Sequence, residues 1–124
     1  MMKKLMITLL LLFTSVQAMA ADALTPEQAQ EQRAQKIVFD FLFNDPNSPR
    51  IGATKPQLTL VVFTDYNCPY CKKFDPYLEK IVENHPEVAV VYKFLPYRAE
   101  SSVTAARDAL TLWRSHPGQF MKFN

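Results

Sequence analysis

The segment Leu58-Thr-Leu-Val-Val-Phe-Thr-Asp-Tyr-Asn-Cys-Pro-Tyr-Cys71 decides the fold of this chain. Residues 58–64 are a β-rich run with little polar alternation, which predicts a central strand buried on both faces. A short turn over residues 65–67 follows, and residues 68 to about 83 then have helical patterning. The apolar side of this helix comprises Phe74, Tyr77, Leu78, Ile81 and Val82. The segment therefore predicts a strand, a turn and a helix that opens at Cys68.

A second strand follows this helix in the sequence. Residues 84–86 (Asn-His-Pro) end the helix, and residues 88–95 form another buried, β-rich run. A strand, a helix of about sixteen residues and a second strand imply a right-handed parallel unit. Residues 50–52 are a candidate for a very short edge strand. The fold class expected from this order is α/β.

The C-terminal part of the chain predicts a third helix. Its apolar positions are Ala105, Ala106, Ala109, Leu110 and Trp113. These positions repeat at helical spacing, and Ser101 or Ser102 is a candidate N-cap. Residues 116–118 (His-Pro-Gly) end the helix, and residues 119–124 resemble the start of another one.

The N-terminal part predicts a helix from Leu24 to about Phe43. Thr25 can cap it, Pro26 suits the first helical position, and Gln28 completes a capping box. The second half, residues 37–43, is apolar almost all round, which exceeds what one contact face requires. Two interpretations remain open: the helix packs on its own domain, or it also packs on copies of itself.

Residues 1–20 have the features of a secretory signal. Lys3 and Lys4 supply a positive start, an apolar run covers residues 5–13, and residues 18–20 (Ala-Met-Ala) form a small-x-small cleavage site. We expect cleavage after Ala20 and a periplasmic location. The apolar run is shorter than the ~20 residues that span a bilayer.

The charge of the exported part is balanced. Once Lys3 and Lys4 are removed with the signal, 12 Lys and Arg face 12 Asp and Glu. This balance argues against nucleic acid or an anionic membrane surface as a partner.

Both cysteines of the chain lie at the start of the predicted second helix, at Cys68 and Cys71. A bridge between residues so close together closes almost no loop, so it suits exchange better than stabilisation. Backbone N–H groups at a helix N-terminus stabilise a thiolate, which should lower the pKa of Cys68. Cys68 is therefore the candidate nucleophile and Cys71 the resolving residue. Pro69 fits the first helical turn, and Tyr70 places an aromatic ring between the cysteines.

Metal binding gives the alternative interpretations. One cysteine pair with the distant His85 and His116 lacks the close second pair of a structural zinc site. Lys72 stands where covalent haem attachment needs histidine. Two thiolates on one helical turn suit Cu(I), so a copper-binding module stays an alternative function, as does a protein with an inert structural bridge. No cofactor is expected for the exchange function.

The motif Phe63-Thr-Asp-Tyr-Asn-Cys-Pro-Tyr-Cys71, with Pro76 eight residues after the first cysteine, resembles the active-site stretch of the thioredoxin superfamily. Its Phe-x-Asp-Tyr-x-Cys-Pro-x-Cys form is similar to the DsbA-like branch. The stretches 41–49 and 96–113 resemble suppressor-of-copper-sensitivity C proteins, which are linked to copper tolerance. The resemblance implies a periplasmic disulfide isomerase or oxidase with a redox-active Cys68–Cys71 disulfide in a Cys-Pro-Tyr-Cys motif.

The resemblance also implies partners and a domain layout. The expected partners are exported proteins with thiols or disulfides, a membrane-bound thiol reductase and signal peptidase, and some relatives trimerise through the helix that matches residues 24–43. The expected layout is a signal peptide (1–20), an N-terminal helix as an oligomerisation stalk (21–46) and the N-terminal portion of a thioredoxin-like domain (47–124).

The family fold continues beyond the helical insertion with a cis-proline loop, two further strands and a last helix. The sequence has no match to these parts, so the expected fold is an incomplete thioredoxin-like, DsbA-like fold. An inactive truncated product is accordingly a further alternative.

Overall fold

The computed structural model describes residues 23–124, so the predicted signal peptide lies outside the described residues. The chain divides into two units, Met1–Ile37 and Val38–Asn124, each considered by itself. Within the described part, no helix has the length and apolar character needed to cross a membrane.

The N-terminal helix begins with the capping box that the sequence predicts. In helix α2 (Pro26–Phe39), the N–H of Gln28 donates to Thr25 Oγ1 over 3.2 Å, and the N–H of Thr25 donates to Gln28 Oε1 over 3.0 Å. The helix continues as one π-helical turn, η1 (Asp40–Asn44). The predicted end near Phe43 is therefore confirmed.

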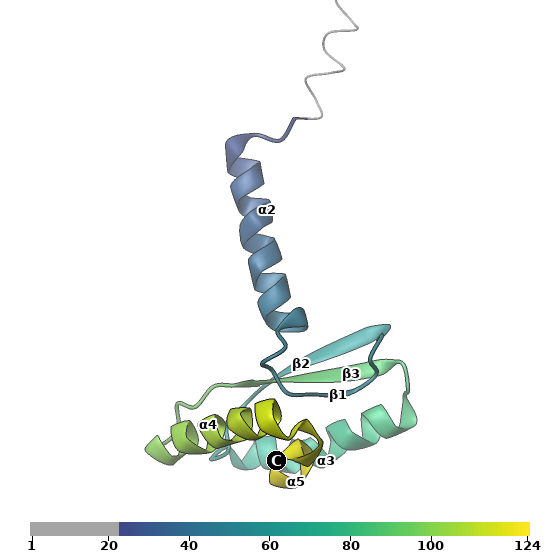
Figure 1. Cartoon of the computed structure of the whole chain (residues 1–124), viewed down its shortest axis with the longest axis vertical. Helices are drawn as coiled ribbons and strands as arrows, with labels where there is room; N and C mark the ends of the chain where they lie inside the picture. The colour runs from purple at the N-terminus through teal and green to yellow at the C-terminus, as the bar shows by residue number, and fades with distance from the viewer. Residues whose placement is uncertain (1–22) are drawn as a thin grey trace, which may run out of the picture. The chain divides into compact units, whose positions relative to one another are not determined.

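The sheet has three strands in the order β1-β3-β2 (Figure 1). The strands are β1 (Arg50–Gly52), β2 (Leu58–Thr64) and β3 (Val88–Phe94). β2 runs parallel to β3 with Leu58 opposite Val88, and β1 runs antiparallel to β3 with Ile51 opposite Val90. The parallel unit and the short edge strand are thus confirmed.

The prediction that residues 58–64 form a central strand buried on both faces is wrong. Among the described residues only β3 pairs with β2, so β2 lies at the sheet edge. Two of its large apolar side chains are open to solvent: Leu58 is 53% exposed and Phe63 is 49% exposed. β3 is the central strand, and its residues 88–93 are all buried.

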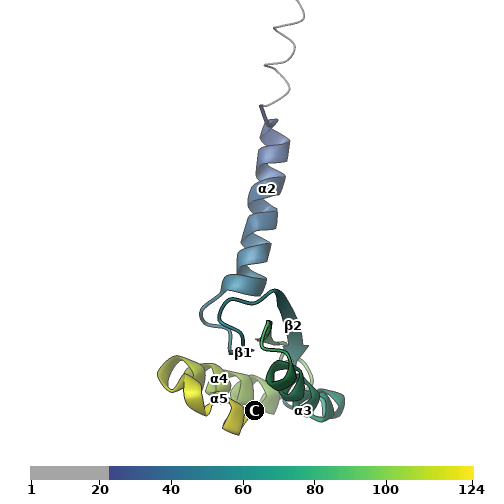
Figure 2. The same ribbon diagram turned by 90° about the vertical axis from the view of Figure 1, so that its right-hand side faces the viewer.

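Helices gather on one side of the sheet (Figures 1 and 2). They are α3 (Pro69–Asn84), α4 (Glu100–Ser115), the 3-10 turn η2 (Pro117–Gln119) and α5 (Phe120–Phe123). The buried core cluster consists of Leu78, Val90, Tyr92, Ala109 and Phe120. Helices α3, α4 and α5 therefore each contribute one residue to this core cluster.

The structure adds one detail to the sequence predictions for α3 and corrects the predicted N-cap of α4. Of the predicted apolar side of α3, only Leu78 is fully buried, and Phe74 and Tyr77 are exposed, because the apolar stripe is wider than the face that meets the sheet. Helix α4 begins one residue before Ser101, with Ala99 as its N-cap and no side-chain cap. The Ser102 hydroxyl is instead buried and donates a hydrogen bond to Asp65 Oδ1.

The segment between η1 and β1 is fastened to the domain by an ion pair. Lys93 of β3 is buried, and its Nζ lies 3.1 Å from Asp45 Oδ2 and 3.8 Å from the centroid of the Phe41 ring. Trp113 Nε1 donates to the Pro46 carbonyl oxygen over 3.0 Å. Burial raises the pKa of Asp45, but hydrogen bonds to it and the charge of Lys93 outweigh burial and lower the pKa overall.

Candidate redox site

The two cysteines form a disulfide at the N-terminus of α3. Cys68 is the N-cap of the helix in an extended conformation (φ −89°, ψ 109°), and Pro69 occupies the first helical turn. The N–H of Cys71 donates to Cys68 Sγ over 3.2 Å, and the two Cα atoms lie 5.2 Å apart. The prediction that a helix opens at Cys68 is confirmed.

This arrangement has a direct chemical consequence for Cys68. Its sulfur lies where the first N–H groups of a helix lack carbonyl partners and where the helix dipole is positive. When the disulfide is reduced, that environment favours negative charge on Cys68 Sγ.

The surroundings of Cys71 are partly apolar and open. A pocket of about 230 Å³ is lined by Val62, Phe63, Thr64, Tyr70, Cys71, Phe74 and Asp75. The Tyr70 ring is 79% exposed, with Lys73 Nζ 5.8 Å from its centroid. Burial, with the nearby charge of Glu79, raises the pKa of Asp75. The pocket therefore offers aromatic surface and one carboxyl group next to the cysteine pair.

A buried carboxylate that sequence reasoning missed lies under the turn that leads to Cys68. Asp65 is 3% exposed, and each of its oxygens accepts two hydrogen bonds. Oδ1 accepts from the N–H of Asn67 over 2.8 Å and from Ser102 Oγ over 2.6 Å. Oδ2 accepts from the N–H groups of Tyr97 over 3.0 Å and Arg98 over 3.1 Å. The carboxylate thus joins the cysteine turn, the loop after β3 and helix α4.

The side chain of Asn67 makes a second connection to the same helix. Its Nδ2 donates to Ser101 Oγ over 3.0 Å and to Ser102 Oγ over 2.7 Å. The start of α4 is therefore bonded both to Asp65 and to the residue directly before Cys68.

The hydrogen bonds also set the ionisation of Asp65. Burial raises the pKa of Asp65, but the bonds from Ser102, Asn67, Arg98 and Tyr97 outweigh it and hold the pKa below 3.8. Because the folded pKa is the lower one, the ionised carboxylate stabilises the fold above about pH 4. That contribution is lost as the pH falls through the folded pKa.

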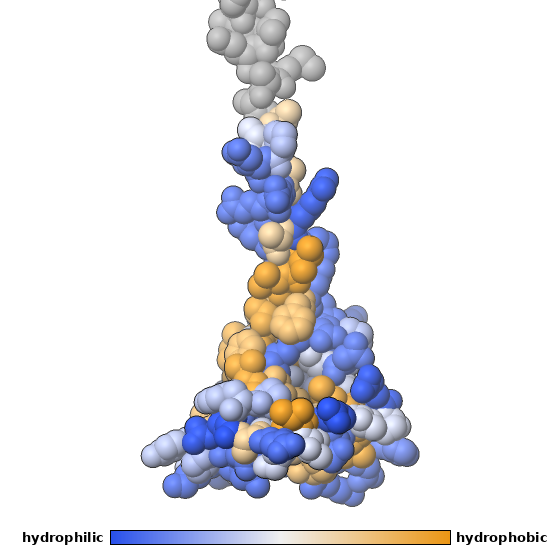
Figure 3. All heavy atoms as spheres, turned by 90° about the vertical axis from the view of Figure 1, so that its left-hand side faces the viewer, coloured by the Kyte–Doolittle hydropathy of each residue, from blue (hydrophilic) through white to orange (hydrophobic). Residues whose placement is uncertain are grey.

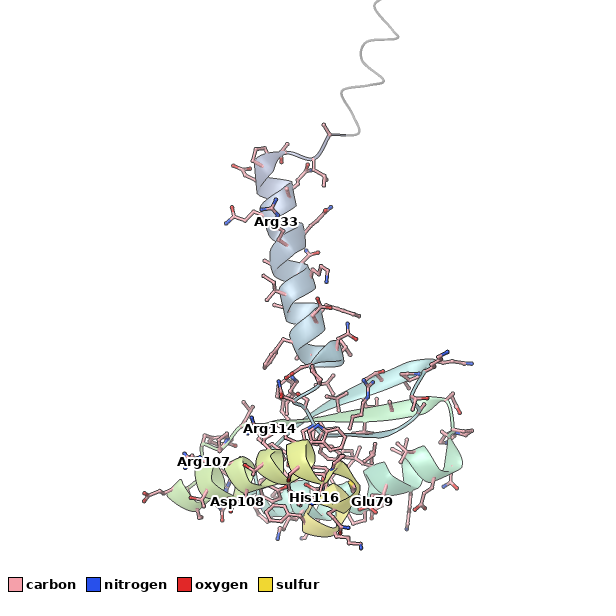
Figure 4. All side chains as sticks on the ribbon, in the orientation of Figure 1. Arg33, Glu79, Arg107, Asp108, Arg114 and His116 are labelled. Carbon is pink, nitrogen blue, oxygen red and sulfur yellow. A yellow bond between two sulfur atoms is a disulfide. The ribbon has the colours of Figure 1, made fainter. Side chains whose placement is uncertain are left out.

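The histidines weighed as metal ligands lie apart from one another. His116 is the C-cap of α4 (Figure 4), and His85 follows the end of α3 with Nδ1 3.5 Å from Glu87 Oε1. Over residues 23–124, no group of three or more His, Cys, Asp and Glu side chains is placed to hold a metal ion.

The part of the chain that contains the cysteine pair and Asp65 matches a known protein family. Residues 59–119 match the DSBA-like thioredoxin domain. No curated protein matches the chain significantly. The matched range begins in β2 and ends in η2, so it contains the cysteine pair and the Asp65 network.

Solved structures resemble the chain in sequence and fold. A periplasmic thioredoxin-like protein from Salmonella enterica serovar Typhimurium is 66% identical over 68% of this chain and 49% of its own, with a TM-score of 0.67. The catalytic domain of Proteus mirabilis ScsC is 53% identical over 71% of this chain and 50% of its own, with a TM-score of 0.67. Proteus mirabilis ScsC in a compact conformation is 44% identical over 96% of this chain and 58% of its own, with a TM-score of 0.67. The chain thus spans about half the length of these structures.

Proposed function

The chain belongs to the DsbA-like thioredoxin family, and from this premise we propose that it exchanges disulfides with exported proteins in the periplasm. The catalytic residues of the proposal are Cys68 and Cys71, with Pro69 and Tyr70 completing the motif between them. The observation that carries the proposal is the disulfide at the start of α3, with the Cys71 N–H donating to Cys68 Sγ.

The proposed exchange moves two electrons through two sulfur atoms. In oxidation, a substrate thiolate attacks Cys68 Sγ, the Cys68–Cys71 bond breaks, and Cys71 leaves as a thiolate. A second substrate thiolate then attacks the substrate sulfur of the mixed disulfide and releases Cys68 as a thiolate. The substrate loses two electrons and gains a disulfide, and the chain is left reduced.

In isomerisation the reduced chain acts first. The Cys68 thiolate attacks an incorrect substrate disulfide, and either a substrate thiolate or Cys71 resolves the mixed disulfide. Resolution by a substrate thiolate returns the chain reduced, whereas resolution by Cys71 leaves the chain oxidised and the substrate reduced by two electrons. The oxidised cysteine pair must then regain two electrons, and we propose a membrane-bound thiol reductase as the partner that supplies them.

The N-terminal residues have a separate proposed role. We assign residues 1–20 to a signal that signal peptidase removes, residues 21–46 to a stalk, and residues 47–124 to a thioredoxin-like domain portion. Exposed apolar side chains support the stalk role, and Figure 3 shows apolar surface along the helical part of the chain. Ile37, Val38 and Phe39 are each more than half exposed. Large exposed apolar patches commonly mark interaction sites, and a second and third copy of residues 24–43 would cover this one.

Placing charge in this apolar stretch should break the proposed trimer. The double variant Ile37→Asp, Val38→Asp should sediment as a monomer where the unchanged chain sediments as a trimer, because buried carboxylates without partners oppose association. Gln32→Asp, on the polar half of the same helix, is the matched control and should leave the trimer intact. A monomeric unchanged chain at micromolar concentration would refute the stalk role.

The pH dependence of thiol alkylation tests the exchange site itself. In the reduced chain, Cys68 should react with an apparent pKa well below the ~8.5 of a free cysteine, and Cys71 should react slowly. Cys68→Ser and Cys71→Ser assign the two reactions. If both thiols titrate together near ~8.5, the chain lacks the proposed site.

A further inference from the structure

The carboxylate of Asp65 accepts four hydrogen bonds. Each of its oxygens faces two donors, and the group is almost fully buried. Only an ionised carboxylate accepts two hydrogen bonds at each of its oxygens at once. An isosteric amide would turn an NH₂ group toward two donors, and a buried donor left unsatisfied is unfavourable. The site therefore requires aspartate in its charged form.

The same residue closes the turn that carries Cys68 into α3. The backbone carbonyl oxygen of Asp65 accepts from the N–H of Cys68 over 2.9 Å, and its Oδ1 accepts from the N–H of Asn67 over 2.8 Å. These two bonds fix the backbone on the N-terminal side of Cys68. The position of Cys68 Sγ, 3.2 Å from the N–H of Cys71, depends on that backbone.

Helix α4 is held to this turn from its own side. Ser102 is 1% exposed, donates to Asp65 Oδ1 and accepts from Asn67 Nδ2. Tyr97 and Arg98, which precede α4, donate their N–H groups to Asp65 Oδ2. The turn before Cys68 and the start of α4 are therefore parts of one hydrogen-bonded network.

We propose that Asp65 is a positioning residue for the cysteine pair: it holds Cys68 as the N-cap of α3 and fastens the start of α4 to the same turn. The inference rests on the exchange function proposed above and extends it to a residue outside the Cys-Pro-Tyr-Cys motif. Asp65 acts through the backbone and does not touch the reacting sulfur atoms.

The test compares two carboxylates that have similar bonds but different places in the fold. Asp65→Asn in the reduced chain should raise the apparent pKa of Cys68 by about one unit, because Sγ is then no longer held beside the N–H of Cys71. Alkylation of Cys68 well below its pKa should then slow by about tenfold. Asp45 accepts from the N–H of Asn47 and from Lys93 Nζ on the segment before β1. Asp45→Asn is the matched control, and it should destabilise the fold and leave the Cys68 titration unchanged.

A second variant covers the case in which Asp65→Asn does not fold. Asn67→Ala removes an exposed side chain and its two bonds to α4 and leaves the Asp65 carboxylate in place. It should slow alkylation of Cys68 in the same direction by a few fold, with the fold retained by circular dichroism. Urea unfolding of every variant separates changes in stability from changes at the thiol.

The outcomes distinguish this inference from the function on which it rests. If the Cys68 titration is unchanged in Asp65→Asn and in Asn67→Ala, Asp65 has only a structural role. A low Cys68 pKa in the unchanged chain would still support the exchange function. If Asp65→Asn does not fold, Asn67→Ala alone decides between these two results. A Cys68 that titrates like a free cysteine in the unchanged chain would overturn both proposals.

Discussion

Replacing Cys71 with serine should trap the chain on its substrates as a stable mixed disulfide, and replacing Cys68 with serine should abolish exchange. The difference follows from the unequal places of the two sulfurs at the start of α3. Cys68 is the N-cap, and its Sγ accepts the N–H of Cys71, so negative charge is favoured there. Without Cys71, the bond between Cys68 and the substrate loses its internal resolving thiol.

Non-reducing electrophoresis of each variant with a scrambled, disulfide-containing model protein measures this effect. Cys71→Ser should give an adduct that disappears on addition of dithiothreitol, and Cys68→Ser should give none. The chain that carries both Cys68→Ser and Cys71→Ser is the negative control. An adduct that forms equally well in Cys68→Ser would contradict the assignment of Cys68 as nucleophile.

The site elements that sequence reasoning predicted correctly are governed by local interactions. The helix opening at Cys68 and the capping box of Thr25 and Gln28 involve bonds between residues three apart. Such bonds depend on the types of neighbouring residues, and the turn and helix chemistry of those residues is known. The two long strands, β2 and β3, could be predicted for a similar reason, because each is a β-rich run.

The position of each strand in the sheet could not be predicted in the same way. Residues 58–64 and 88–95 are both apolar, and the sequence pattern of each fits a central strand. Which strand is central depends on pairing between distant segments, and here β1 pairs with the far side of β3. An apolar run indicates that a strand is buried, but the order of the strands in the sheet decides how much of that strand becomes buried.

Residues that support the site through distant partners were missed for the same reason. Asp65 and Ser102 are 37 positions apart, and Lys93 and Asp45 are 48 positions apart. The Asp-x-Asn pattern before Cys68 is a recognisable turn signal, and the N–H of Asn67 does bond to Asp65 Oδ1. That signal identifies the turn, but it does not reveal that the second donor to Oδ1 comes from α4. Lys93 gives a second signal, because a charged residue within an apolar strand needs a partner of opposite charge.

Truncating Phe120 to alanine should lower the free energy of unfolding by about 3–5 kcal/mol, the cost typical of a large aromatic removed from a packed core. Phe120 begins the four-residue helix α5 and is 1% exposed. Its ring centroid lies 5.4 Å from that of Tyr92, 6.0 Å from that of Trp113 and 6.5 Å from that of Phe94. The side chain therefore joins the central strand to helix α4.

Urea unfolding followed by circular dichroism measures the loss, provided that the slope with denaturant stays constant. Phe123→Ala is the matched control, because Phe123 lies on the same short helix but is 43% exposed and meets only the edge of the aromatic cluster at Tyr66. Its cost should stay near 1 kcal/mol or below, about the value of one exposed aromatic contact. Equal costs for the two variants would mean that α5 does not pack as described. A large cost for Phe120 alone would show that this short helix completes the core that carries β3 and, through it, the loop that bonds to Asp65.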